Sequence, residues 1–63
     1  MNSDILYSYY KGFIDGANND VLYLLKSDIT KDKNNGFLTA SHYARLLRMI
    51  AKRRKEIKVS EIA

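Results

Sequence analysis

Apolar residues in the first half of the chain recur at intervals of three and four. At 100° per residue these positions fall within about 80° of arc, which is typical of an amphipathic helix packed on a core. Ser3 or Asp4 is a suitable N-cap, because its side-chain oxygen can accept a free first-turn N–H. The pattern predicts one long helix over about residues 3–31. The series comprises Leu6, Tyr10, Phe13, Ala17, Val21 and Leu24.

One segment of this predicted helix contains the signals of a break. Gly16 is a possible stop, and Asn18 to Asp20 offer a possible new N-cap. A break here would give three helices instead of two. The apolar series keeps its phase across the segment, however, and two independent helices would have no reason to share a phase. We therefore expect Gly12 to Val21 to be helical throughout.

A second helix is predicted after a clear turn. Residues 32–38 include Asn34-Asn35-Gly36, and these residue types tolerate positive φ. Thr39 is then the expected N-cap, with Leu38 packing on Tyr43 as a hydrophobic staple. The helix is predicted over about residues 40–57, and residues 59–63 are expected to fray. Its apolar positions are Tyr43, Leu46, Leu47, Ile50, Ala51 and Ile57.

Two amphipathic helices joined by a short turn predict an all-α antiparallel hairpin, forming a single domain over residues 1–63. In this arrangement the start of the first helix projects beyond the end of the second, and its aromatic residues need a cover. Two hairpins paired as a four-helix bundle would supply it. The expected homodimer or partner interface is Tyr7, Tyr9, Tyr10 and Phe13.

Composition limits how so small a chain can be stabilised. A 63-residue chain buries only about 60% of its unfolded surface. Cysteine is absent and His42 is the single histidine, so disulfides and a zinc site are excluded. We expect no metal or other cofactor. Residues 1–4 lack the basic start of a signal peptide and no apolar run reaches membrane-spanning length, so a cytoplasmic location is expected.

Charge is distributed unevenly. Five aspartates and three lysines give residues 1–32 a net charge of −2, whereas eight Lys or Arg and two Glu give residues 33–63 a net charge of +6. Cations on the polar side of the second helix could neutralise successive phosphates of a nucleic acid, or meet an acidic protein. The alternative is a solvated basic face that keeps the protein soluble. The candidate binding residues are Arg45, Arg48, Lys52, Arg53 and Lys55.

Two further charges lie at the predicted seam between the helices. Arg54 falls inside the apolar arc of the second helix, and Asp20 lies at the edge of the apolar arc of the first. An ion pair between them would fix the register of the helices. The simpler alternative is that both side chains extend to water.

Catalytic chemistry is not indicated. Ser41 and His42 are adjacent in sequence, so on a helix they point about 100° apart. No glycine-rich nucleotide motif and no pair of facing carboxylates is present. We therefore expect a non-enzymatic, homodimeric regulatory or adaptor protein that docks on another macromolecule, with inhibition of that macromolecule as one form of the docking. The alternative is a dimer that binds DNA or RNA through the basic face of the second helix.

Overall fold

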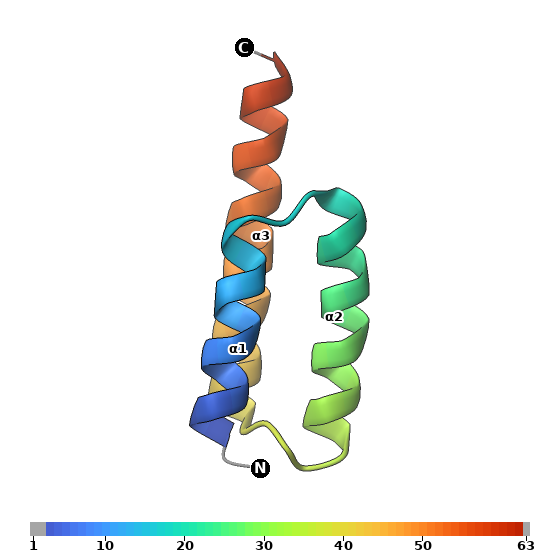
Figure 1. Ribbon diagram of the computed structural model, residues 1–63, viewed down its shortest axis with the longest axis vertical. Coiled ribbons are helices and arrows are strands. Elements are labelled where there is room, and N and C mark those ends of the chain that lie inside the picture. Colours follow the sequence, from blue (N-terminus) through green and yellow to red (C-terminus); the bar gives the residue numbers. More distant parts are fainter. Residues whose placement is uncertain (1–2, 63) are drawn as a thin grey trace.

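The computed structural model describes residues 3–62, with side chains described for residues 3–60. These residues form three helices, α1 (Ser3–Asp15), α2 (Asn19–Asn34) and α3 (Ala40–Ile62). In Figure 1, α1 and α3 run in the same direction and α2 runs in the opposite one. The all-helical class is confirmed, with an up-down-up arrangement of three helices.

The chain breaks where the stop signals lie, so the prediction of one helix over residues 3–31 is wrong. α1 ends at Asp15, and the Ala17 N–H donates to the Ile14 carbonyl at 3.2 Å. Asn18 then adopts an extended conformation (φ −86°, ψ 178°), and its Oδ1 accepts the Val21 N–H at 2.9 Å. This side-chain cap satisfies a first-turn donor of α2 and so stabilises the new start.

The second turn follows its sequence signals closely. Gly36 has a φ of +82°, and its N–H donates to the Lys33 carbonyl at 3.1 Å. The Phe37 N–H donates to the Asp32 carbonyl at 2.8 Å, which completes a Schellman motif. Because this motif uses the last turn of a helix, α2 continues to Asn34 instead of ending near Lys31.

Thr39 is the N-cap of α3, as predicted. Its Oγ1 accepts the His42 N–H at 3.1 Å, while Leu38 is buried in the core against which Tyr43 packs. α3 continues to Ile62, one turn beyond the predicted end near Ile57. The expected fraying of residues 59–63 stays a prediction, and Ala63 lies outside the described residues.

The core lies along the seam where the three helices meet. Leu22, Ile29 and Leu46 are fully buried, and replacing such a residue by alanine typically costs about 2–5 kcal/mol. α3 packs against both other helices, which contact each other less extensively. The buried residues of the core are Tyr10, Ile14, Ala17, Leu22, Leu25, Ile29, Leu38, Leu46 and Ile50.

The predicted projection of the first helix beyond the second is wrong because of the direction in which α1 runs. Because α1 runs parallel to α3, Tyr7 and Tyr10 lie against the bundle instead of projecting beyond it. The C-terminal end of α3 is what extends past the other two helices (Figure 1). A pair of two-helix hairpins therefore does not describe this three-helix chain. Dimerisation stays a prediction.

Candidate functional site

An apolar surface lies where α1 and α2 meet, on the side of the bundle away from α3. Tyr9 and Phe13 from α1 and Val21 and Leu24 from α2 line a depression of about 350 Å³. Tyr9 is 59% exposed, Phe13 49% and Leu24 62%. The Tyr9 and Phe13 rings meet edge to face, with centroids 4.8 Å apart. We call this surface, with the exposed Ile5 one turn before Tyr9, the apolar face.

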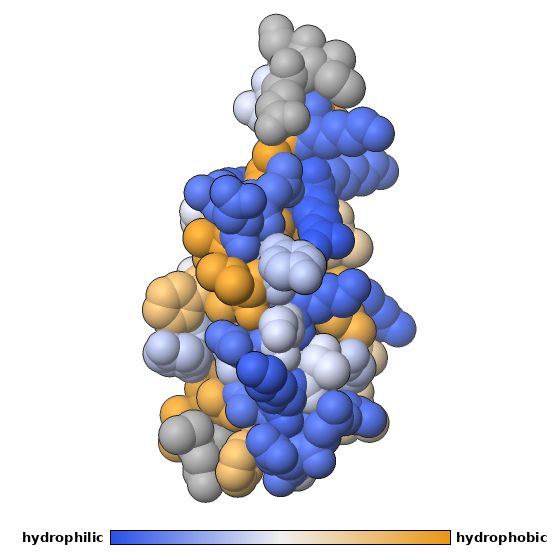
Figure 2. Space-filling view, turned by 90° about the vertical axis from the view of Figure 1, so that its right-hand side faces the viewer, coloured by the Kyte–Doolittle hydropathy of each residue, from blue (hydrophilic) through white to orange (hydrophobic). Residues whose placement is uncertain are grey.

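Hydrophobic and hydrophilic side chains gather on different parts of the face shown in Figure 2. In Figure 2, hydrophobic side chains are visible mainly toward the left of the view, and hydrophilic ones cover the right and the upper part. Clustered exposed apolar residues on a small soluble protein mark an interaction surface more often than scattered ones do. The apolar face is therefore the first candidate site.

The predicted aromatic interface is divided by the fold. Tyr9 and Phe13 belong to the apolar face, but Tyr10 is buried and its hydroxyl donates to the Asp32 carboxylate. Tyr7 is half-buried and stacks on the His42 ring, with centroids 4.7 Å apart. Tyr7 and Tyr10 are thus structural within one chain. The sequence pattern did not indicate that Val21 and Leu24 lie at the surface, because both fit the phase of the predicted core stripe.

The environment of Tyr10 changes its acidity. Burial raises the pKa of the Tyr10 hydroxyl well above its ordinary value of 10.0. The hydrogen bond to Asp32 and the negative charges of Asp32 and Asp28 raise this pKa further. The neutral phenol is therefore the form that holds α1 to α2.

His42 joins the N-terminal ends of α1 and α3. Its Nδ1 lies 2.6 Å from the Ser3 Oγ, and its Nε2 lies 3.1 Å from an Asp4 carboxylate oxygen. The Thr39 N–H donates to the same Ser3 Oγ at 3.3 Å. With the imidazole proton on Nε2, the Ser3 hydroxyl donates to His42 Nδ1 and His42 Nε2–H donates to Asp4. Together with the Thr39 N–H bond to Ser3, these contacts form one continuous hydrogen-bond network.

This cluster contains the residue types of a hydrolase triad, but its position indicates a structural role. Ser3 accepts a backbone N–H at the start of α3, and the Tyr7 ring covers one face of His42. The α1/α2 depression and the α2/α3 groove are both lined by other side chains. Although His42 lies in the first turn of a helix, its side chain does not face solvent and is only 17% exposed.

Four of the five predicted binding cations share the outer side of α3. At 100° per residue they fall within about 80° of arc, opposite the buried Leu46 and Ile50. All four are exposed, and none forms an ion pair within residues 3–60. We call Arg45, Arg48, Lys52 and Lys55 the basic stripe.

Arg53 is not part of this stripe. It is half-buried, and its Nε donates to the Ala17 carbonyl at 2.9 Å. Its guanidinium also lies 3.5 Å from Glu56. Arg53 therefore stabilises the turn between α1 and α2 from the side of α3.

The predicted register pair is not brought together. Asp20 is exposed in the first turn of α2, where a carboxylate interacts favourably with the helix dipole. Arg54 is exposed on α3, and no ion pair joins the two in the described part of the chain.

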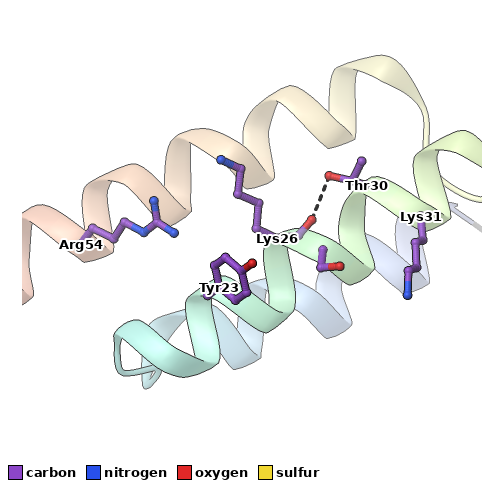
Figure 3. Close-up of a pocket in the computed structure, with 6 residues that line it drawn as sticks. Tyr23, Lys26, Thr30, Lys31 and Arg54 are labelled. Atoms are coloured by element: carbon purple, nitrogen blue, oxygen red, sulfur yellow. Dashed lines mark hydrogen bonds between the residues drawn. The ribbon is translucent and has the colours of Figure 1, made fainter.

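A second surface, between α2 and α3, was not anticipated. Tyr23 and Arg54 point into a groove of about 550 Å³ from the two helices (Figure 3). The α2 contribution lies at positions 23, 26, 27, 30 and 31, which is the spacing of one helical face. That spacing was readable from the sequence, but the face is polar and gave no core signal. The lining residues are Tyr23, Lys26, Ser27, Thr30, Lys31 and Arg54.

The described residues contain neither a cluster suited to a metal ion nor a helix suited to crossing a membrane. No three His, Cys, Asp or Glu side chains among them converge closely enough to hold a metal ion. None of the helices within residues 3–62 combines the length and hydropathy needed to cross a bilayer.

Comparison with known proteins returned no match to any protein-family model, curated protein or solved structure. Function must therefore be inferred from the surfaces of the molecule.

Proposed function

We propose that this chain is a small non-enzymatic adaptor or regulatory protein that pairs with a second copy through the apolar face and docks on another macromolecule as a dimer. The observation that carries the proposal is the exposure of Tyr9, Phe13, Val21 and Leu24 around one depression. Pairing would remove this surface from water and add to the small core of each chain.

The distribution of charge favours a second copy as the occupant of the apolar face. α3 carries seven Lys or Arg and two Glu, and its basic stripe points away from that face. Each chain is about 15 Å thick. Symmetrical pairing would hold the two basic stripes farther apart than the screening length of about 8 Å at physiological salt. Like charges would then oppose the association only weakly.

Sedimentation equilibrium at tens of micromolar tests the pairing. We expect a dimer for the natural sequence and a monomer for Tyr9→Ala or Leu24→Ser. Tyr23→Ala is the matched control, because Tyr23 is also an exposed tyrosine but lies in the α2/α3 groove. A folded monomer of the natural sequence, or equal dissociation by Tyr9→Ala and Tyr23→Ala, would contradict the proposal.

A second candidate function is nucleic-acid binding by the dimer. It is favoured by the exposure of all four cations of the basic stripe and by the lack of ion pairs to them within residues 3–60. A tagged pull-down from the native host, with and without nuclease, separates the two functions. The adaptor function predicts that the captured partner is protein and survives nuclease, whereas the second function predicts its loss.

A further inference from the structure

The α2/α3 groove combines an exposed aromatic ring with an excess of positive charge. Lys26, Lys31 and Arg54 line it together with two hydroxyl-bearing residues, and none of the six lining side chains is acidic. Tyr23 is 70% exposed, so one face of its ring is free to contact a ligand. In Figure 3, Arg54 and Lys31 lie on opposite sides of Tyr23, and the Lys26 side chain extends from α2 toward α3.

The positive character continues along the seam on both sides of this groove. Toward the second turn, the Lys33 ammonium lies 5.6 Å from the centre of the Tyr43 ring. Toward the C-terminal end, Lys58 follows Arg54 by one helical turn and is also exposed. A flexible polyanion could thus follow the seam past Tyr23.

We propose that the α2/α3 groove binds single-stranded nucleic acid, with a base stacked on Tyr23 and the phosphates on either side held by Lys26, Lys31 and Arg54. An aromatic platform between cations suits this ligand because every base offers a flat face and every linkage a negative charge. The site is independent of the proposed dimer, whose apolar face lies on the other flank of α2.

The same chemistry disfavours two other polyanions at this site. The bases of a duplex are stacked on one another, so they cannot reach a side chain that stands in a groove of the protein. An acidic peptide would satisfy the three cations but would leave the exposed ring of Tyr23 without a stacking partner. Dependence of affinity on the ring therefore identifies the ligand class.

Fluorescence anisotropy of a labelled oligothymidylate at low salt tests the proposal. We expect Tyr23→Ala to weaken binding by roughly tenfold or more, because a base loses its stacking partner. Tyr23→Phe should restore most of the affinity, since the ring remains. Tyr9→Ala is the matched control, an exposed tyrosine on the opposite flank, and should bind the oligonucleotide as the natural sequence does.

Salt dependence tests the role of the cations. For single strands, each neutralised phosphate contributes about −0.7 to the slope of log affinity against log salt, so three contacts give about −2.1. Arg54→Gln should reduce the magnitude of that slope by about 0.7. Circular dichroism of each variant checks that the exposed substitutions leave the helices intact.

The outcomes separate this proposal from the dimer. No binding at high micromolar protein, or equal affinity for Tyr23→Ala and the natural sequence, would overturn the groove site whatever the oligomeric state. Equal competition by polyglutamate would assign the groove to an acidic protein instead. Loss of dimerisation in Tyr9→Ala with retained oligonucleotide binding would support both proposals together.

Discussion

The Nε of Arg53 donates a hydrogen bond of 2.9 Å to the backbone carbonyl of Ala17. The bond connects α3 to the turn that follows α1, thirty-six positions away in the sequence. It satisfies the backbone carbonyl of Ala17, which lies in the turn and accepts no hydrogen bond from a continuing helix. This contact fixes where the first turn sits on the third helix.

We therefore expect Arg53→Ala to lower the free energy of unfolding by about 1–2 kcal/mol, because a charge-assisted hydrogen bond and part of a half-buried side chain are lost. Chemical denaturation followed by circular dichroism measures the change. Arg54→Ala removes the same charge from the neighbouring exposed position and should change stability by less than about 0.5 kcal/mol. Equal losses in the two variants would mean that the bond to Ala17 is unimportant.

The cap at the start of α2 gives a second prediction. Asn18→Ala removes the acceptor for the Val21 N–H and should cost about 1 kcal/mol. Asn18→Asp should retain most of the stability, because a carboxylate also caps a helix. Asn19→Ala is the matched control, since Asn19 lies inside the helix and its side chain is not the cap. If thermal unfolding shows the same loss for both alanine variants, the cap is not what starts α2.

Tyr10 is expected to make the folded protein less stable at high pH. Its folded-state pKa is raised above the unfolded value of about 10, chiefly by burial and then by Asp32. The unfolded chain therefore loses this proton first, so the stabilising contribution is complete below about pH 10 and is lost as pH rises further. Tyrosinate absorbance during alkaline titration should show a delayed component that coincides with unfolding.

Tyr10→Phe is the variant that checks this assignment. It should lack the delayed component and lose about 1 kcal/mol at neutral pH, since the hydrogen bond to Asp32 is gone. A delayed component that persists in Tyr10→Phe would assign the effect to another tyrosine.

The basic stripe predicts salt-sensitive binding to duplex DNA. Four phosphate contacts give a slope of about −3.6 for log affinity against log salt. Arg48→Gln should weaken duplex binding and reduce that slope by about 0.9, whereas Lys11→Gln, the same charge change on α1, should not. Flat titrations at high micromolar protein and low salt would show that the stripe is only a solvated face.

Local signals predicted the second turn and the start of α3 well. Thr39 and Gly36 each act through hydrogen bonds to residues a few positions away, so their roles are encoded in short segments. The break at Gly16 to Asn18 was also marked by local signals. The prediction of a continuous helix is wrong there because the side-chain cap of Asn18 starts a new helix even though the apolar series keeps its phase.

The apolar residues that were predicted to form one core stripe over residues 3–31 include those of the apolar face. Phe13, Val21 and Leu24 keep the phase of a core stripe, but the chain reverses after Ala17 and places all three at the surface. The true core positions of α2 are Leu22, Leu25 and Ile29, on a neighbouring side of that helix. Periodicity alone could not separate the two sides, since both are apolar.

The contacts that the sequence could not predict are those that depend on the direction of α1. Tyr7 meets His42, and Arg53 meets Ala17, only because α1 and α3 are parallel. The α2/α3 groove does not involve α1, but it depends on the register of the two packed helices, which brings Arg54 and Tyr23 to one surface. Contacts between residues so distant in sequence depend on how the helices are arranged, and no local sequence pattern specifies that arrangement.

The dominance of α3 in the packing also determines when this protein can fold during its synthesis. α1 is complete at Asp15, but its main packing partner supplies its last buried core residue at Ile50, 35 residues later. At about 5–20 residues per second, the ribosome needs roughly 2–7 s to add that stretch. Until α3 is made, the apolar residues of α1 and α2 that pack against α3 in the folded protein lack that partner. Complete packing of the three-helix core must therefore wait until α3 has been synthesised.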